Sequence, residues 1–187
     1  MRALAAFVLA AAIGGCAGPG ALPRHAQPPL PAPAGLPCCW QSQEQVHVSA
    51  QGADQTLLAA VAVTPGKLTL VAFDGLGRRL VTVVHTGGEP QTLDAPPGWS
   101  AELSHQLLLA IYLHNLALDQ WRFDDPGWSV VEATARESRI RSLRYGKREL
   151  VRLSYATPGD GGDSARDVEY IGRDIRLGIL TLSRADL

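Results

Sequence analysis

The sequence predicts a mostly β fold of the α+β kind, an antiparallel, incomplete β-barrel of about 8–11 strands covered by one main helix. Short segments with alternating apolar and polar residues run through most of the chain, and glycine-containing turns separate them. Such alternation is typical of antiparallel strands that bury one face and expose the other. One longer segment, residues 100–117, repeats its apolar residues at helical spacing instead.

The strand predictions follow from these alternating segments, taken in chain order. The predicted strands are residues 45–48, 56–64, 68–73, 80–85, 128–132, 139–145, 149–155, 168–171 and 175–182. Short turns, such as Pro65-Gly66 and Gly146-Lys147, separate several neighbouring segments. Consecutive strands joined by tight turns indicate an antiparallel meander.

The predicted helix follows a proline-glycine break at residues 96–98. Ser100 suits the N-cap and Glu102 suits the first helical turn. Apolar residues lie at helical spacing along the segment, and further leucines add apolar surface on its other sides. A helix that is apolar most of the way round is either buried or covers an apolar cavity.

The N-terminus has the features of a secretion signal. Arg2 precedes an apolar run over residues 3–13, which is shorter than the roughly 20 residues that a membrane-spanning helix needs. The run fits the apolar region of a signal peptide, about 7–15 residues long. Ile13-Gly14-Gly15-Cys16 then resembles the lipobox of bacterial lipoproteins. This resemblance implies cleavage after Gly15 and acylation of Cys16, palmitate included, whereas the alternative is an ordinary signal with an incidental cysteine.

The lipobox resemblance also predicts a location. Two or more acyl chains anchor a protein stably to a membrane. In enteric bacteria an aspartate after the lipidated cysteine retains the protein in the inner membrane, so Ala17 implies the periplasmic face of the outer membrane. The expected partners are then the membrane, through Cys16, and the machinery that processes and sorts lipoproteins.

The chain divides into three predicted parts. Residues 1–15 are the signal peptide, residues 16–39 are the lipidated cysteine and a proline-rich tether, and residues 40–187 are the barrel domain. Seven prolines lie between residues 17 and 37, and a stretch of this composition favours an extended tether over a core.

Cysteines and histidines give no sign of a metal site or other cofactor. Disulfide-linked Cα atoms usually lie about 4.4–6.8 Å apart, whereas consecutive Cα atoms are ~3.8 Å apart. The neighbours Cys38 and Cys39 could therefore link two molecules, stay reduced, or form a strained bridge to each other. Because the histidines lack ligand spacing and no second cysteine pair exists, we expect neither a metal nor a cofactor.

Charge and motifs exclude several function classes. The net charge of −1 gives no argument for nucleic-acid binding. Seven basic residues lie within residues 136–152. They form either the solvated faces of strands or a docking patch. No hydrolase elbow, phosphate-binding loop or zinc-protease motif appears, and the polar-aromatic segment 119–126 is interpreted as a loop that closes over the barrel. We therefore do not expect an enzyme.

Several segments carry a family resemblance. They are Gln45 and residues 68–73 (LTLVAF), 77–80 (GRRL), 118–121 (LDQW), 167–170 (DVEY) and 175–179 (IRLGI), all within residues 40–184. Together they resemble a family of proteobacterial lipoproteins, classed as a domain of unknown function and often encoded in aryl-polyene gene clusters. Members are similar to the outer-membrane lipoprotein receptor and its periplasmic carrier. The resemblance implies an incomplete barrel, with helices over its mouth, around an apolar cavity for acyl chains.

The resemblance also implies a membrane-facing loop. The receptor uses an exposed leucine on a protruding loop to insert lipoproteins into the membrane. Leu76, in the turn Gly75-Leu76-Gly77, is the candidate for this role here, and burial of Leu76 within the turn is the alternative.

Two functional hypotheses follow. The first is a module that binds or transfers a lipid-like molecule, acyl or polyene, or an acylated protein, in an apolar pocket with few polar groups. Its predicted lining residues are Leu70, Phe73, Val83, Leu107, Ile111, Leu113, Leu177 and Ile179. The alternative is a non-catalytic structural or assembly lipoprotein that docks onto envelope partners through the arginine-rich hairpin 139–152.

Overall fold

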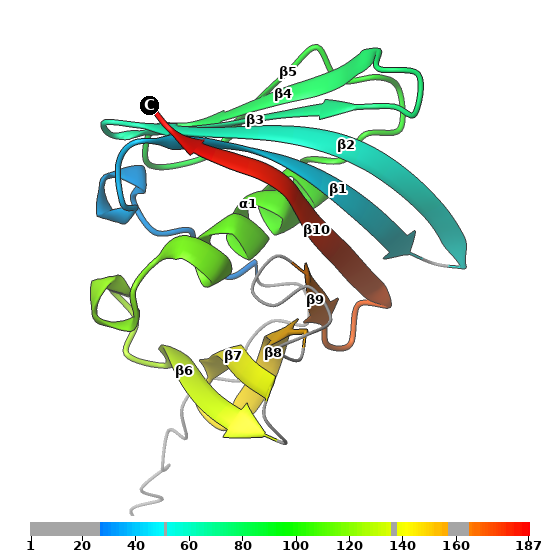
Figure 1. Ribbon diagram of the computed structural model, residues 1–187. Coiled ribbons are helices and arrows are strands. Elements are labelled where there is room, and N and C mark those ends of the chain that lie inside the picture. Colours follow the sequence, from blue (N-terminus) through cyan, green and yellow to red (C-terminus); the bar gives the residue numbers. More distant parts are fainter. Residues whose placement is uncertain (1–26, 51, 136–137, 157–164) are drawn as a thin grey trace, which may run out of the picture.

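The computed structural model describes residues 27–50, 52–135, 138–156 and 165–187, in which ten antiparallel strands form one sheet (Figure 1). The strands are β1 Trp40–Ala50, β2 Ala53–Thr64, β3 Lys67–Phe73, β4 Arg79–His85, β5 Gln91–Leu93, β6 Trp128–Ala135, β7 Ser138–Tyr145, β8 Arg148–Tyr155, β9 Ala165–Tyr170 and β10 Ile175–Asp186. The helical elements are α1 Ala101–Asn115 and the short 3₁₀ turns η1 Pro33–Gly35 and η2 Leu118–Gln120.

Two meanders make up the sheet, in the order β5-β4-β3-β2-β1-β10-β9-β8-β7-β6. The antiparallel pair β1–β10 joins them. The edge strands β5 and β6 are not neighbours in this order, so the sheet is not closed into a barrel. The predicted fold class is therefore confirmed as a mostly β domain with one main helix and an open, curved antiparallel sheet.

Strand alternation separates an inner face from an outer one. In β1, residues from Trp40 to Val48 are alternately buried and exposed. The sequence predicted this strand only from Gln45, because the inward positions Ser42 and Glu44 are polar and interrupt the apolar pattern. Strand β5 was not predicted, because its three residues are too few to show a period.

Helix α1 lies inside the curve of the sheet, between strands β1–β5 and β10 on one side and β6–β9 on the other (Figure 1). It begins after Ser100, whose side chain accepts a hydrogen bond from the Leu103 backbone N–H over 3.0 Å. Every residue from 104 to 113 is buried. The helix therefore packs its apolar sides against the inner face of the sheet and forms a single core with it.

Part of the segment assigned to the tether packs against the domain. Pro28, Pro31, Pro33 and Leu36 are buried, and Leu36 belongs to the core. The packed region thus includes residues before Trp40. Just before β1, a disulfide joins two neighbouring cysteines across a cis peptide bond, Cys38–Cys39. The predicted signal peptide and Cys16 lie outside the described residues.

Substitution of one core leucine tests the position of α1. We expect Leu109→Ala to lower the free energy of unfolding by about 2–5 kcal/mol, because Leu109 is fully buried on the helix. Leu182→Ala is the matched control, since Leu182 is exposed on β10, and it should change the value by less than about 0.5 kcal/mol. Urea denaturation measures both, and equal effects would show that α1 does not pack inside the sheet.

Candidate functional site

The predicted cavity residues gather in the interior, with one exception. Seven of them are buried members of the single core, namely Leu70, Val83, Leu107, Ile111, Leu113, Leu177 and Ile179. Phe73 is the exception and does not line the interior, because Leu68, Leu70 and Ala72 occupy the inward positions of β3. Phe73 lies on the outer face opposite Leu58 of β2. Three of the seven belong to α1, and this helix occupies the space that the four strand residues line.

Leu76 lies in the turn between β3 and β4 and is 82% exposed, so the interpretation that it is buried is wrong. Asp74 holds the turn by accepting hydrogen bonds from the backbone N–H groups of Leu76 and Arg78, each over 2.9 Å. These bonds, the Arg78 bond foremost, keep the pKa of the Asp74 carboxyl below its usual range. The turn therefore presents Leu76 to its surroundings in a fixed conformation.

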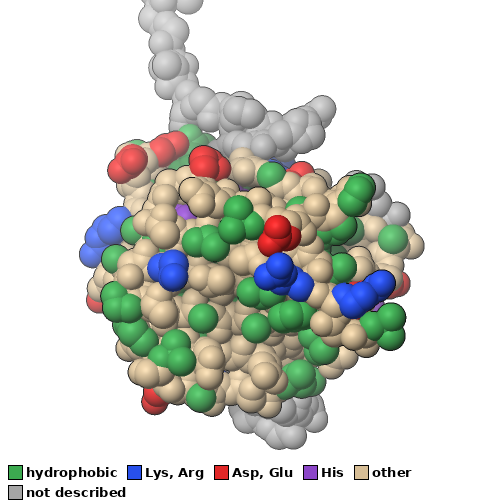
Figure 2. Space-filling model, turned by 90° about the horizontal axis from the view of Figure 1, so that it is seen from above, with side chains coloured by type: hydrophobic (Ala, Val, Ile, Leu, Met, Phe, Trp, Pro, Cys, Tyr) green, Lys and Arg blue, Asp and Glu red, His purple; other side chains and the backbone are tan. Residues whose placement is uncertain are grey.

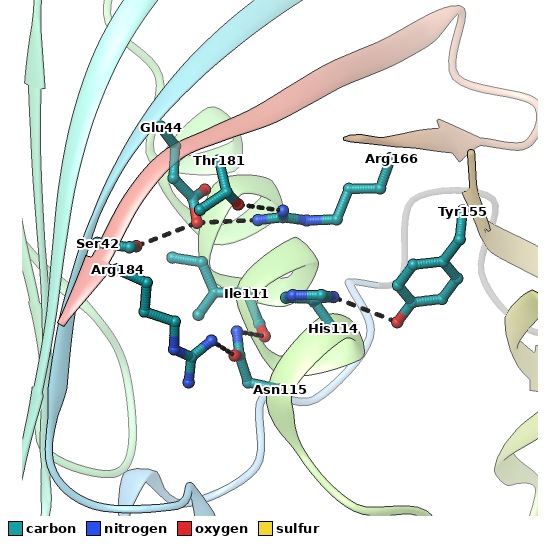
Figure 3. A network of polar contacts seen from close by, with 9 residues as sticks. All are labelled: Ser42, Glu44, Ile111, His114, Asn115, Tyr155, Arg166, Thr181 and Arg184. Atoms are coloured by element: carbon teal, nitrogen blue, oxygen red, sulfur yellow. Dashed lines mark hydrogen bonds and ion pairs between the residues drawn. The ribbon is translucent and has the colours of Figure 1, made fainter. Parts of the chain in front are cut away.

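A buried ion pair crosses the sheet near the C-terminal half of α1 (Figure 3). Arg166 of β9 donates to Glu44 of β1 over 2.9 Å, and the two side chains are 1% and 6% exposed. Arg166 also donates to Thr181 over 2.8 Å, and Ser42 donates to Glu44 over 3.2 Å. Removal of one partner alone would leave a buried charge, at a cost of about 3–5 kcal/mol.

Arg141 of β7 caps the C-terminal end of α1. One guanidinium nitrogen, Nη1, donates to the carbonyl oxygens of Leu113, His114 and Leu116 over 2.9, 3.3 and 2.9 Å. Its Nε donates to Glu132 over 2.5 Å. The last carbonyls of a helix lack partners within the helix, and a cation there is favourable. Arg141 therefore ties the end of α1 to the second meander.

Arg184 of β10 makes a second tie at the same end. Its Nη1 donates to the side-chain oxygen of Asn115 over 2.8 Å, and its guanidinium carbon lies 4.0 Å from the centre of the Trp40 ring. Asn115 in turn donates to the Ile111 carbonyl over 2.9 Å. Figure 3 shows Arg184 and Asn115 facing each other below Ile111.

His114, in the last turn of α1, lies in a positively charged environment. Its Nδ1 is 3.3 Å from the Tyr155 hydroxyl, and the Arg139 guanidinium carbon lies 3.9 Å from the centre of that ring. Burial, and then the charges of Arg166, Arg184, Arg139 and Arg141, lower the pKa of His114 to about 3. The imidazole is therefore neutral at physiological pH.

Two donors in this region lack an acceptor. The indole Nε1 of Trp40 and the Nε of Arg166 are buried and have no hydrogen-bond partner within the described part of the chain. Most buried polar groups in proteins are hydrogen-bonded, so each exception needs an explanation.

Other polar contacts hold the N-terminal half and the middle of α1. Ser104 accepts hydrogen bonds from Thr92 and from the Trp99 indole over 3.0 and 2.9 Å. The Tyr170 hydroxyl donates to the Gln106 carbonyl. The Tyr112 hydroxyl is 2.8 Å from His85 Nδ1, and burial lowers the pKa of this histidine.

A cleft of about 1090 Å³ lies beside the N-terminal end of α1. Charged side chains of both signs line it, among them Glu102 of the helix, Arg148, and the pairs Arg173–Glu102 and Arg176–Glu169. The cleft extends to Tyr170, one of the residues that hold the helix.

The structure divides the arginine-rich hairpin between two faces. Arg139 and Arg141 point inward, as their contacts with Tyr155 and α1 show. Arg152 instead pairs with Glu149 and is partly exposed. The basic residues of segment 136–152 that the structure describes therefore do not form one docking patch.

Sequence reasoning missed the inward-facing polar residues Glu44, Arg166 and Arg184. A signal for Glu44 was present, because Ser42 and Glu44 keep the same register as the apolar inward residues Val46 and Val48. An acidic residue at an inward strand position predicts a buried basic partner. The sequence does not show that this partner lies two strands away, on β9.

Within the described residues, no group of three or more histidine, cysteine, aspartate or glutamate side chains is placed to hold a metal ion. In the same part of the chain, no helix has both the length and the apolar composition needed to cross a membrane.

Comparison with known proteins gives a family match. The model of the family described as "Protein of unknown function (DUF3261)" matches residues 41–183. No curated protein matches the sequence. Among solved structures, the crystal structure of a DUF1329 family protein from Desulfovibrio piger matches with 11% identity and a TM-score of 0.32, over 79% of this chain and 85% of that one. A likeness at this level carries no conclusion about function.

The neutral state of His114 predicts a pH dependence of stability. Its pKa in the folded chain, about 3, lies below the ordinary value of 6.5, so between these values the unfolded chain binds a proton that the folded chain does not. Stability should therefore fall as the pH drops from about 6.5 towards 3. Burial gives His85 and His105 pKa shifts in the same direction.

His114→Gln should weaken the pH dependence of stability, because unfolding then takes up about one proton fewer per molecule. His85 and His105 keep their contributions to the slope. Thermal unfolding midpoints measured across this pH range test the prediction. An unchanged slope in the variant would mean that His114 is not held neutral in the folded chain.

Proposed function

The chain belongs to the DUF3261 family, and for this member we propose a lipid-anchored envelope protein whose domain binds a long apolar chain in the place that α1 occupies. One observation carries the proposal. The interior of an open antiparallel sheet is filled by a single helix that is buried from residue 104 to residue 113, and no strand pairing closes the sheet around it. Helix α1 is thus an internal occupant of an apolar binding space.

Exchange of α1 for a ligand leaves the sheet intact. The helix is connected to the two edge strands, β5 and β6, and it contributes nothing to the strand ladders. Its withdrawal breaks apolar packing and a set of side-chain hydrogen bonds, while every strand pair remains. The helix would then have two positions, inside the sheet and withdrawn from it. A ligand that binds only the open sheet shifts the population toward the withdrawn position.

An apolar chain can compensate for the lost packing. Burial of one methylene group stabilises by about 0.8 kcal/mol. An acyl or polyene chain of ordinary length would therefore contribute several kcal/mol of burial free energy in place of the leucine contacts of α1. The cleft of about 1090 Å³ beside the N-terminal end of the helix provides an approach from outside. The occupant in this proposal is a lipid-like molecule or the acyl chain of an acylated protein.

The face of the domain seen from above gives less support to a docking role. In Figure 2, which views the domain from above, hydrophobic side chains lie in separate small groups with few charges between them. Scattered exposed hydrophobic residues are normal on soluble proteins, whereas interaction sites have larger continuous patches. Of the inward arginines of the hairpin, Arg141 binds the end of α1 and Arg139 lies over the Tyr155 ring. The interior therefore supports a binding function better than this face supports docking.

Localisation is the second part of the proposal. The lipobox-like sequence at Cys16 and the following Ala17 favour an acyl anchor on the periplasmic face of the outer membrane. The packed region includes Pro28, so a short linker would hold the domain near that membrane. The exposed turn with Leu76 is the candidate for membrane contact.

Binding of cis-parinaric acid, a fluorescent polyene fatty acid, tests the apolar site. We expect saturable binding of one molecule by the chain with Cys16→Ser, a change that removes the protein's own acyl chains. Tyr170→Phe should raise the apparent affinity about fivefold, because it removes one hydrogen bond that holds α1 in place. Fluorescence titration measures both values.

Tyr145→Phe is the matched control, because the Tyr145 hydroxyl interacts with Asp125 and not with α1. It should leave the affinity unchanged. Absence of saturable binding, together with lipid-free protein after purification from the envelope, would overturn the proposed function.

Metabolic labelling with palmitate tests the anchor. The wild-type chain should incorporate label and fractionate with the outer membrane, because Cys16 supplies the acceptor thiol. The Cys16→Ser chain should remain unlabelled and appear in the soluble periplasmic fraction. Equal labelling of both chains would exclude Cys16 as the site.

A further inference from the structure

Guanidinium groups from three strands surround the C-terminal turn of α1. They belong to Arg141 of β7, Arg166 of β9 and Arg184 of β10. In the described part of the chain, the ion-pair partners of Arg141 and Arg166 are Glu132 and Glu44. Figure 3 shows Arg166 and Arg184 on either side of Ile111, near His114 and Asn115. This end of an otherwise apolar interior thus brings together three guanidinium groups, two of them paired with a carboxylate.

The last turn of α1 supplies several of the oxygen atoms that accept hydrogen bonds from these guanidinium groups. Arg141 donates to three carbonyl oxygens of the last turn, and Arg184 donates to the side-chain oxygen of Asn115. If an apolar chain replaced α1, these acceptors would leave with the helix. The Arg141 side chain is only 11% exposed, and a guanidinium in such a place is destabilised when it loses acceptors, so a purely apolar ligand would be a poor replacement.

Two further donors need an acceptor even while α1 is in place. Arg166 Nε and Trp40 Nε1 have no partner within the described residues, although the Arg166 side chain is 1% exposed and Trp40 is 3% exposed. The Trp40 ring lies under the Arg184 guanidinium, which places the indole at the same end of the interior. Each buried donor without an acceptor needs an explanation, and oxygen atoms of a ligand would supply one for these two.

We propose that this end of the interior recognises the anionic oxygens of the ligand's head, so that the ligand is a long-chain amphiphile with a carboxylate or phosphate at one end. The inference rests on the proposed function and specifies its ligand class. The chain would replace the leucine surface of α1, and the head would replace the oxygens that α1 gives to Arg141 and Arg184. Planar guanidinium groups suit both heads, because they bind two oxygens of one anion at once.

Oleic acid and oleyl alcohol distinguish recognition of the head from recognition of the chain, because the two molecules share one chain. With the Cys16→Ser protein at about pH 8, where a carboxyl group is ionised, calorimetric titration should give at least about tenfold tighter binding of the acid. Oleoyl lysophosphatidic acid, with a phosphate head, should bind like the acid. Inorganic phosphate alone should bind far more weakly than either, since it lacks the chain.

Arg184→Gln should lower the affinity for oleic acid about tenfold and leave the affinity for oleyl alcohol unchanged. Arg184 is exposed and is not part of any ion pair between described residues, so the change leaves no buried charge behind. Arg152→Gln is the matched control, because Arg152 of β8 is partly exposed, pairs with Glu149 and does not line the cleft. It should leave both affinities unchanged.

The outcomes separate the inference from the proposed function. Equal binding of acid and alcohol overturns the inference and leaves the apolar site standing, as does an equal loss of acid binding in both arginine variants. Binding of neither ligand overturns the proposed function, and the inference with it. Tight binding of inorganic phosphate without binding of either oleyl compound indicates a small-anion site, which also overturns both.

Discussion

Contact between helix α1 and the inner face of the sheet is the interaction on which the rest of the domain depends. An open antiparallel sheet buries only one face of each strand, and that face must be covered by something apolar. Here the inward residues of β1–β4 and β8–β10 pack against a helix that carries four leucines between residues 107 and 113. Without α1, or a substitute of similar shape and polarity, this inner face would be exposed to water.

The polar contacts at the ends of the helix give this packing its orientation. Strand β1 changes register against β10 between Gln43 and Glu44, and Glu44 then lies opposite Thr181. This irregularity brings Glu44 within reach of Arg166, which extends across β10 from β9. Bulges of this kind are common beside functional sites, where they redirect a side chain. The same end of the interior therefore combines a register shift of the sheet with the buried ion pair Arg166–Glu44.

Much of the fold could be predicted from the sequence, because its elements are marked by local patterns. The leucine spacing after Ser100 predicted a helix over residues 100–117, and the structure has one at Ala101–Asn115. Alternation predicted nine of the ten strands, some with shorter bounds. The three-residue strand β5 shows no periodicity and was missed. The burial of Pro28 and Leu36 was also missed, because a proline-rich composition does not reveal which side of an extended segment meets a core.

The candidate site was less accessible to prediction, because it depends on contacts between residues far apart in the chain. Glu44 and Arg166 are separated by 122 positions, and Arg141 reaches carbonyl oxygens more than twenty positions earlier. Apolar periodicity places leucines in an interior but does not show whether a cavity or a helix fills it. Phe73 shows the limit of the pattern, since it was predicted as a lining residue although the two-residue period of β3 directs it outward.

The central claim is that α1 and an amphipathic ligand compete for one space inside the sheet. Hydrogen exchange of the backbone amides of residues 105–113, measured with and without saturating oleic acid, tests it most directly. The claim predicts faster exchange along this part of α1 in the presence of ligand, while the amides in the ladder between β1 and β10 keep their protection. Unchanged or slower exchange along α1 at saturation would show that the helix stays in the core when the ligand is bound, and would contradict the claim.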